Sequence, residues 1–347
     1  MKSKSKSKTI LIILDGVSEE EIHELNHMTP LQYAFTPTLN EIIKSGSHNK
    51  TIFYPENRDP DSLNCILSIL GVNEDMIPKN RAYLEALSAG IKIESDEAVL
   101  RCNLISVENN KLQSFNGMGL SKQEMKTASL NVVTKNNLKF YHISDYRNLI
   151  IVKKNKHILS LNNMPPHENV GQSMDRMLEF IKCQDVLNNF VNENKISINE
   201  TDYMFYPWGV AKPVKLPSFK SLHNKSCCCV CNAEIVRGIA IAMNIELVNL
   251  KNSTGDVDTD LIEKASAVLN EIKTHDVVIA HINGTDEISH RKDIRGKIEF
   301  IEKIDREFLR VIYDNIGSDT KIVIVSDHRT STITGKHEKG NVDIIIG

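Results

Sequence analysis

TILIILD, at residues 9–15, is a nearly continuous apolar run, and HDVVIAHI at 275–282 and TKIVIVSD at 320–327 repeat the pattern. A strand with one face in water alternates polar and apolar residues, and these stretches do not. KTIFYP, at 50–55, is a fourth stretch of this kind. The pattern predicts buried strands in a mostly parallel sheet with helices on both faces.

Helical periodicity separates these strands at residues 36–46, 231–244, 259–275 and 295–317. Strands that alternate with helices predict an α/β fold with a doubly wound, mostly parallel sheet. From residue 96 to 170 the apolar runs shorten and Asn and Lys gather at the turns. We therefore expect a core made of residues 1–95 and 171–347, with a smaller α+β cap domain, 96–170, inserted into it.

The composition gives no sign of a polyanionic or membrane partner. The 347 residues include 42 Lys and Arg against 45 Asp and Glu, a formal net charge of −3. The lysines near the amino end precede an apolar run that is too short for a signal peptide and lacks a cleavage site, so we expect a basic tail before a buried strand. No segment approaches the ~18 apolar residues of a membrane span. We expect a cytoplasmic protein that binds neither nucleic acid nor membrane, whose oligomeric state the sequence leaves open.

Four of the seven cysteines lie in SCCCVCN, at residues 226–232. Adjacent cysteines do not readily turn toward one tetrahedral ion, and no further Cys/His pair follows at zinc-finger spacing. The favoured interpretation is a set of small buried side chains in a strand, with a structural zinc site as the alternative.

Potential metal ligands follow three of the predicted strands. They are Asp15, the pair Asp286 and His290, and the pair Asp327 and His328, with His337 nine residues further on. Each has an ordinary explanation alone, as a turn residue, a helix-surface pair or a surface histidine. Ligands gather at the carboxyl ends of parallel strands, however, and together these side chains predict a metal centre there.

The spacing of these residues suits two ions. Asp286 and His290 are four residues apart and point the same way on a helix, whereas Asp327 and His328 are adjacent and point apart. Oxygen and nitrogen ligands without a thiolate suit Mn²⁺, Zn²⁺ or Mg²⁺, in two sites of about three protein ligands each. Two such ions can clamp a phosphoryl group and activate a nucleophile.

A serine at the start of a predicted helix is either a helix cap or a nucleophile. In RDPDSLNCILSILG, residues 58–71, Ser62 stands before an apolar run, and by itself this position predicts a helix N-cap. The free amides of a first helical turn also bind phosphate.

Several segments occur in the order that they have in a known family: ILDGVSEEE, MTPLQYAFTPTLNEIIKSG, SLNCILSILGV, RAYLEALSAGI, LRCNLISV, YPWGVAKPVKLPSF, STGDVDTD, DEISHRKD and VSDHRTSTITGKH. Over essentially its whole length the chain resembles the archaeal-type cofactor-independent phosphoglycerate mutases, which belong to the alkaline phosphatase superfamily. The resemblance implies interconversion of 3-phosphoglycerate and 2-phosphoglycerate, without bisphosphoglycerate, through a phosphorylated Ser62.

The resemblance also implies two divalent ions, usually Mn²⁺ or Zn²⁺, and a small phosphorylated metabolite as substrate. It assigns Asp15, Ser62, Asp327 and His328 to one ion and Asp286, His290 and His337 to the other. Candidates for binding the anionic groups of the substrate are Arg81, Arg101, Arg147 and His167. An equally good explanation of Arg101 and Arg147 is that they pin the strands of the cap domain.

Two residues depart from the family pattern beside the nucleophile. Leu63 and Ile66 stand where the family usually has an acidic residue and a histidine. Two alternatives to the mutase therefore stay open. One is a related metal-dependent phosphatase or phosphotransferase on another small metabolite, such as the proposed homoserine kinase branch, and the other is a non-catalytic metal-binding relative.

Overall fold

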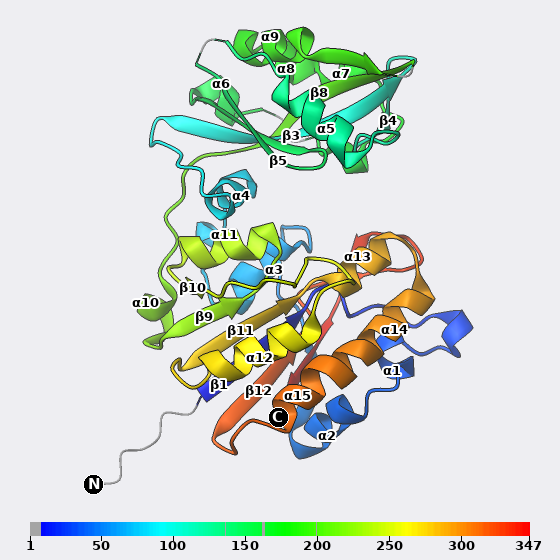
Figure 1. The fold of residues 1–347 in the computed structure, drawn as a ribbon, viewed down its shortest axis with the longest axis vertical. Coiled ribbons are helices and arrows are strands. Elements are labelled where there is room, and N and C mark those ends of the chain that lie inside the picture. The colour runs from blue at the N-terminus through cyan, green and yellow to red at the C-terminus, as the bar shows by residue number, and fades with distance from the viewer. Residues whose placement is uncertain (1–7, 136, 162–163, 199) are drawn as a thin grey trace. The chain divides into compact units, whose positions relative to one another are not determined.

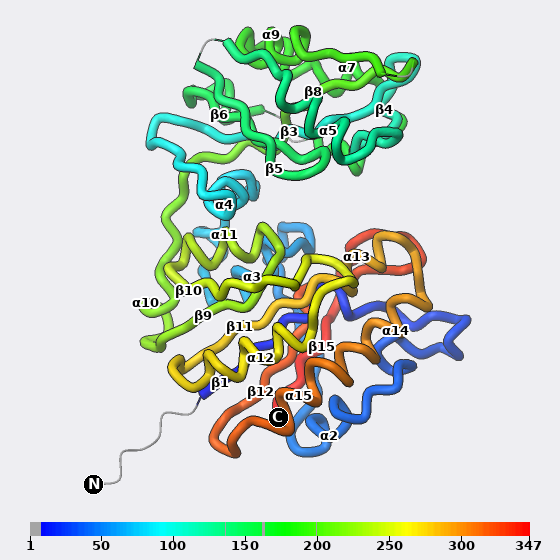
Figure 2. Tube along the Cα trace, viewed as in Figure 1, coloured from blue at the N-terminus to red at the C-terminus, as the bar shows by residue number. Residues whose placement is uncertain are grey.

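The computed structural model describes residues 8–135, 137–161, 164–198 and 200–347, so the expected basic tail lies outside the described residues. The chain forms two compact units. The first comprises the residues up to Ile77 together with Leu216–Gly347, and the second comprises Pro78–Lys215. Figure 2 traces the chain by colour as it leaves the first unit in the blue-to-cyan region and returns to it in yellow-green. The second unit is thus an insertion in the first.

Within the described residues, the first unit is built on a seven-stranded sheet in the order β10-β9-β11-β1-β12-β15-β2. The five strands from β10 to β12 run parallel, whereas β15 is antiparallel to both of its neighbours. The strand bounds, in sheet order, are Glu246–Leu247, Cys227–Val230, Val277–Ile282, Lys8–Leu14, Thr320–Val325, Val342–Ile346 and Ser47–Thr51.

Helices cover both faces of this sheet (Figure 1). One face packs against α2 (Pro37–Ser45), α12 (Leu261–Glu271) and α14 (Ile294–Ile304), which continues through a π-helical turn, Asp305–Leu309, into α15 (Arg310–Tyr313). The other face carries α3 (Ser62–Ile69) and α11 (Glu234–Ala242), which contact each other. Shorter elements of this unit are α1 (Pro30–Tyr33), α10 (Phe219–His223), α13 (Gly284–His290), β13 (Arg329–Thr330) and β14 (His337–Glu338).

The architecture confirms the predicted α/β class, with a mostly parallel sheet covered on both faces. The expected buried strands at 9–15, 275–282 and 320–327 are β1, β11 and β12, the three adjacent strands at the centre of the sheet. The prediction for KTIFYP was wrong, because the strand there is β2, Ser47–Thr51, which is largely exposed at the sheet edge. β15, which lies between β12 and β2, was not anticipated.

An antiparallel sheet forms the second unit, in the order β5-β6-β3-β8-β7, with β4 also paired to β3. The bounds of β3 to β8 are Glu97–Glu108, Lys111–Ser114, Lys139–Ser144, Arg147–Lys153, Lys195–Ile198 and Thr201–Ala211. Of the described helices, one face of the sheet packs against α5 (Lys122–Leu130), α6 (Lys156–Leu159), α7 (Met174–Met177), α8 (Glu179–Lys182) and α9 (Asp185–Glu193). The other face carries α4 (Ala82–Ser88).

The bounds of this unit differ from the expected cap domain, 96–170. Residues 171–215 belong to the second unit and not to the core, because β8 pairs along most of the length of β3. At the other end, α4 packs against β3 and β8 and so joins the same unit. Sequence reasoning placed the boundaries where the pattern of apolar runs changed, but long-range strand pairing decides them.

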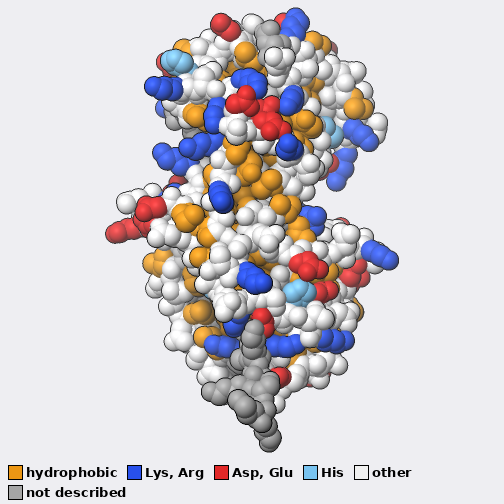
Figure 3. Space-filling view, turned by 90° about the vertical axis from the view of Figure 1, so that its left-hand side faces the viewer, with side chains coloured by type: hydrophobic (Ala, Val, Ile, Leu, Met, Phe, Trp, Pro, Cys, Tyr) orange, Lys and Arg blue, Asp and Glu red, His pale blue; other side chains and the backbone are white. Residues whose placement is uncertain are grey.

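None of the helices that the structure describes combines the length and the hydrophobicity that a membrane span needs. Among the described residues on the face drawn in Figure 3, positive and negative side chains are interspersed. This distribution matches the near-balanced composition.

Candidate metal centre

The predicted ligands converge because three parallel strands end together. β1 lies between β11 and β12, with Leu14 level with Ile282 and Ile13 level with Val325. The chain therefore delivers Asp15 and Asp327 to one edge of the sheet, and β11 leads there into α13. This is the carboxyl edge, where ligand sites of open α/β sheets form.

A first group of side chains surrounds His328. Its Nε2 atom lies 3.3 Å from Asp15 Oδ1, 3.4 Å from Asp327 Oδ2 and 3.3 Å from Ser62 Oγ. All four residues are buried. The structure thus brings together the residues that the resemblance assigns to one ion.

Ser62 is the first residue of α3, but it is not the N-cap. The cap is Asp61, whose side chain accepts a hydrogen bond of 2.7 Å from the backbone N–H of Asn64. The prediction of an N-cap at Ser62 was therefore wrong by one residue. Because Asp61 supplies the capping oxygen, the hydroxyl of Ser62 is left to face His328.

A second group surrounds Asp286 on α13. His290 Nε2 lies 3.2 Å from Asp286 Oδ2, as the four-residue spacing predicts, and His337 Nε2 lies 3.3 Å from Asp286 Oδ1. One ligand atom from each of these three residues lies within 4.8 Å of the others. Asp15, Asp286 and His328 satisfy the same criterion, so the two groups adjoin.

Neighbouring hydrogen bonds fix the orientation of two imidazoles. His290 Nδ1 lies 2.9 Å from the carbonyl oxygen of Gly335, which only accepts, so Nδ1 is the protonated nitrogen. Thr330 Oγ1 donates to Asp286 Oδ1 at 2.6 Å and so accepts from His328 Nδ1 at 3.1 Å. In both rings Nε2 faces the carboxylates with its lone pair free for a metal.

The carboxylates of this centre repel one another. Burial, reinforced by the charges of Asp327 and Asp286, raises the pKa of Asp15 well above its usual value. Burial likewise raises the pKa of Asp327 to about 7. Burial would also raise the pKa of Asp286, but the neighbouring imidazoles of His290 and His337 outweigh it and hold this pKa well below its usual value. A bound cation would relieve this repulsion.

The chemistry of the donor atoms fits divalent ions. Three buried atoms at the cluster, Asp15 Oδ1, Asp327 Oδ2 and His337 Nε2, make no hydrogen bond within the described residues. Buried polar atoms normally have partners, and oxygen and nitrogen atoms in this arrangement suit Mn²⁺, Zn²⁺ or Mg²⁺.

Sequence reasoning missed His281, a polar residue inside the fully buried strand β11. Its Nε2 lies 3.2 Å from Asp15 Oδ2, and it groups with Asp15 and Asp327 as a possible ligand set. Burial lowers the pKa of His281 to about 3, so the ring is neutral at physiological pH. The available signal was a histidine in the otherwise apolar run VVIAHI.

A glycine is required where β1 meets the centre. Gly16 has a φ of +60°, and a Cβ there would lie 2.4 Å from Thr330 Oγ1 and 2.8 Å from Asp286 Oδ1. Its backbone N–H donates to Asp327 Oδ1 at 3.1 Å. The Asp-Gly pair therefore supplies a ligand and leaves room for the groups that orient the others.

The arginine candidates lie in the second unit, around one buried carboxylate. Glu85 Oε1 and Oε2 lie 2.8 Å and 2.9 Å from the Nε atoms of Arg81 and Arg101, and the Arg101 guanidinium stacks 4.2 Å above the ring of Trp208. Burial lowers the pKa of Arg101 to about 10, which leaves it charged at neutral pH. These contacts fit the alternative in which the arginines hold elements of the second unit together. The positive charges of Arg81 and Arg101 exceed the single negative charge of Glu85.

The other two candidates are on the same unit. Arg147 lies 5.3 Å from the ring centre of Tyr146, and its charge acts on Glu85. His167 is partly exposed and meets the rings of Trp208 and Phe115 edge to face.

Comparison with known proteins places this arrangement in a family. The model of the Metalloenzyme superfamily matches residues 7–347. The chain belongs to this superfamily. Membership agrees with the convergence of buried acidic and histidine side chains at one sheet edge.

Similar proteins have been described as phosphoglycerate mutases. The chain is 26% identical to a 2,3-bisphosphoglycerate-independent phosphoglycerate mutase of Methanosarcina acetivorans, over 98% of this chain and 90% of the relative. It is 27% identical to a protein of the same description from Saccharolobus islandicus, over 98% of this chain and 88% of the relative. The expected kinship with archaeal-type mutases is thus confirmed at the level of homology.

Two solved structures share the fold. A protein of Pyrococcus horikoshii superposes with a TM-score of 0.80 at 23% identity, over 99% of this chain and 87% of that one. The cofactor-independent phosphoglycerate mutase of Thermoplasma acidophilum gives 0.57 at 17% identity, over 98% and 89%.

Proposed function

We propose that the protein is a two-metal phosphoglycerate mutase that interconverts 3-phosphoglycerate and 2-phosphoglycerate through a phosphoserine at Ser62. The observation that carries the proposal is the position of Ser62 Oγ at the first turn of α3, 3.3 Å from His328 Nε2 and beside the clustered carboxylates. Mutase relatives that match nearly the whole chain support it.

In this proposal Asp15, Ser62, Asp327 and His328 hold one divalent ion, and Asp286, His290 and His337 hold the other. Such ions, when bound, supply positive charge that stabilises the transferring phosphoryl group and favours an ionised Ser62 hydroxyl.

The chain's own residues then carry the covalent steps. Ser62 Oγ attacks phosphorus, the Oγ–P bond forms, and the bond from phosphorus to the O3 oxygen of glycerate breaks. The departing O3 oxygen takes up a proton, the 2-hydroxyl gives one up as its oxygen attacks phosphorus, and Ser62 Oγ leaves in its ionised form, so the protons balance. The free amides at the start of α3 stabilise the phosphate on Ser62.

Holding the glycerate between the two steps requires cations. The cluster of Arg81, Arg101 and Arg147 around Glu85 is the candidate, because its excess positive charge suits a carboxylate or phosphate. His167, the fourth candidate, remains in this set, because its ring meets that of Trp208, over which Arg101 stacks.

The direct test adds 3-phosphoglycerate and Mn²⁺ to the pure protein and follows 2-phosphoglycerate. Ser62→Ala should lower the rate by at least about 10³-fold, because the covalent route is lost. Ser68→Ala is the matched control, since this serine lies on the same helix and donates to the Asn64 carbonyl at 2.8 Å, away from His328. Equal turnover by wild type and Ser62→Ala would refute the mutase.

A second candidate function is transfer of the phosphate to water or to another small acceptor such as homoserine. It is favoured by Leu63 and Ile66, which are buried in the core beside Ser62 and offer no charge to a substrate. A panel of phosphorylated metabolites, assayed for inorganic phosphate and for phosphorylation of Ser62 by mass spectrometry, separates the two. Phosphate release without 2-phosphoglycerate supports this candidate, whereas bound metal without any phosphoserine supports a non-catalytic relative.

A further inference from the structure

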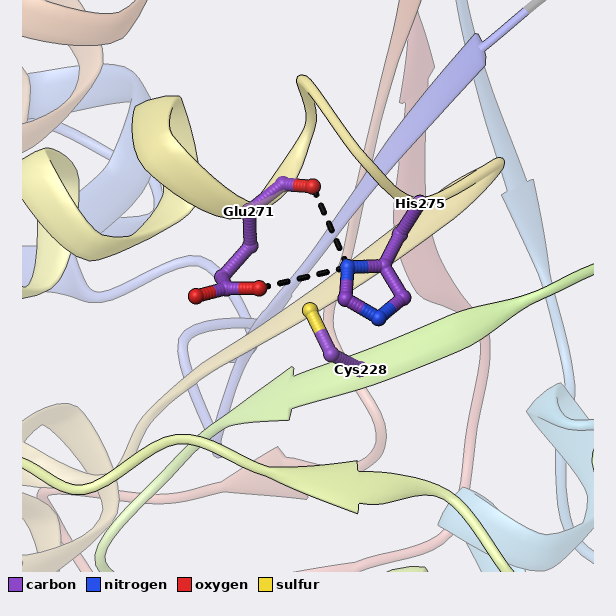
Figure 4. A group of neighbouring side chains, drawn as sticks. All are labelled: Cys228, Glu271 and His275. Carbon is purple, nitrogen blue, oxygen red and sulfur yellow. Dashed lines mark hydrogen bonds and ion pairs between the residues drawn. The ribbon is translucent and has the colours of Figure 1, made fainter.

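A second group of metal-ligand side chains lies in the first unit, where the parallel strands of its sheet begin. One ligand atom each from Cys228, Glu271 and His275 falls within 4.8 Å of the others. Figure 4 shows the Cys228 thiol and the Glu271 carboxylate on the same side of the His275 ring. The candidate metal centre uses none of these residues.

Three elements bring these side chains together. Cys228 is on β9, Glu271 is the last residue of α12, and His275 lies in the short connection from α12 to β11. Because β9, β11 and β1 are parallel, the beginnings of β9 and β11 lie opposite the edge where Asp15 and Asp286 gather. The two groups are therefore separated by the length of the strands.

We propose that Cys228, Glu271 and His275 form a zinc site that is distinct from the candidate metal centre. Zn²⁺ accepts one sulfur, one nitrogen and one oxygen ligand, and its bonds of about 2.0–2.3 Å place tetrahedral ligands about 3.5 Å apart. Small closing movements of side chains that already lie within 4.8 Å reach this geometry. A water molecule completes the four ligands. Mn²⁺ and Mg²⁺ disfavour a thiolate, so this site differs in metal preference from the other.

The surroundings of His275 suit a metal ligand. Its Nδ1 atom lies 3.2 Å from both the Oε2 atom and the carbonyl oxygen of Glu271 (Figure 4), and its Nε2 atom lies 3.3 Å from Glu246 Oε2. Glu246 on β10 is the register partner of Cys228, so the strand pairing itself places this carboxylate beside the site. Zinc binding therefore moves the ring proton from Nδ1, where the Glu271 carbonyl accepts it, to Nε2, where the Glu246 carboxylate accepts it and fixes the tautomer that binds zinc.

Zinc binding at this site releases a proton. The ion replaces the thiol proton of Cys228, which goes to solvent, and Nε2 carries the remaining ring proton toward Glu246. Burial raises the pKa of the Cys228 thiol, so without a metal the thiol is protonated. The ion supplies the charge that makes the thiolate stable in this position.

The same three residue types also occur in cysteine nucleophile sites with a histidine base and an acid. Here the Cys228 side chain has no exposed surface, so a substrate cannot reach it, whereas His275 and Glu271 open to solvent with side-chain exposures of 13% and 28%. A small ion can enter from the His275 side. Burial of the thiol thus favours metal binding over catalysis.

The test uses the full chain, stripped of metal by a chelator under reducing conditions and titrated with Co²⁺ as the probe. We expect a sulfur-to-cobalt charge-transfer absorption whose final intensity corresponds to one thiolate-bound Co²⁺ per chain, which oxygen and nitrogen ligands cannot produce. Cys228→Ser should abolish it. His275→Gln should lower the affinity for Co²⁺ at least about 10-fold. Because His275 is more exposed than Cys228, this second variant tests the site even if Cys228→Ser does not fold.

Matched controls separate this site from its neighbours. Cys227→Ser removes the adjacent thiol, and Cys65→Ser removes the thiol on α3, the helix of Ser62; both should keep the absorption. Asp286→Asn should also keep the absorption, but it should lower the total metal content. This variant therefore distinguishes loss of the zinc site from loss of the metal centre on which the proposed mutase depends. Absence of the band in wild type, its survival in Cys228→Ser, or its loss in Cys65→Ser would each overturn the proposal.

Discussion

Thr330 shows how a single hydroxyl can organise the candidate metal centre. The residue is fully buried, and its Oγ1 joins Asp286 Oδ1 to His328 Nδ1, one residue from each group of ligands. It binds no ion in the proposed scheme but holds two ligands in position. Such outer hydrogen bonds commonly govern the affinity of the ligands they orient.

Replacing Thr330 by Val removes this hydroxyl with little change in shape. We expect Thr330→Val to weaken Mn²⁺ binding about 10-fold or more, measured by calorimetric titration of the metal-free protein. Thr330→Ser keeps the hydroxyl and should stay close to wild type. Thr332→Val is the buried control, because this hydroxyl donates to Glu19 at 2.8 Å and contacts neither group. Mn²⁺ binding by Thr330→Val as tight as that of wild type would contradict the positioning role.

At the scale of elements, Glu85 ties helix α4 to the sheet of the second unit. It receives Arg81 from the start of its own helix and Arg101 from β3. Burial alone would raise the pKa of Glu85, but the charges of Arg101 and Arg81 outweigh it and lower the pKa below 4.5. The ionised carboxylate therefore stabilises the fold above pH 4.5, and this contribution is lost as the pH falls through the lower pKa of the folded state.

Glu85→Gln should remove this dependence on pH. At neutral pH we expect the free energy of unfolding to fall by about 3 kcal/mol, because Arg101 keeps a buried charge without its partner. Below pH 4.5 the difference from wild type should shrink, as followed by urea unfolding at several pH values. Glu94→Gln, in an exposed pair with Lys92, should change the free energy by less than about 1 kcal/mol. This account is refuted if the free energy of unfolding of Glu85→Gln falls below pH 4.5 as steeply as that of wild type.

At the scale of the whole molecule, the two units have separate cores. One large apolar cluster joins β1, β11 and β12 to α2, α12 and α14, and another joins β3, β6 and β8 to α5, α7 and α9. A segment with its own sheet and core can fold alone. We therefore expect residues 78–215, which form one unit of contacts, to form a unit of folding too.

The fragment 78–215 should unfold cooperatively on heating, as followed by circular dichroism. The fragment 96–170 is the matched control. It lacks β8 and α4, which leaves one long edge of β3 unpaired and one face of the sheet uncovered, so it should not fold. Cooperative unfolding of 96–170 together with failure of 78–215 would show that the sequence-based boundaries were the better ones.

The sequence by itself determined the class of the fold and the identity of most candidate ligands. Continuous apolar runs require burial on both faces, and residues that directly follow parallel strands necessarily meet at one edge. Asp15, Asp286, His290, Asp327 and His328 were therefore identifiable from their positions after these runs. These are local signals, in which a short stretch carries both the element and the residue at its end.

Only the tertiary structure decided the features that depend on contacts far apart in the chain. The pairing of β8 with β3 set the bounds of the second unit, and Asp61 took the capping role expected of Ser62. Cys228 and His275 lie close together because β9 and β11 begin side by side, although the spacing of the two residues in the sequence resembles no known metal motif. The physical reason is that strand register and helix packing place side chains whose separation along the chain carries no periodic signal.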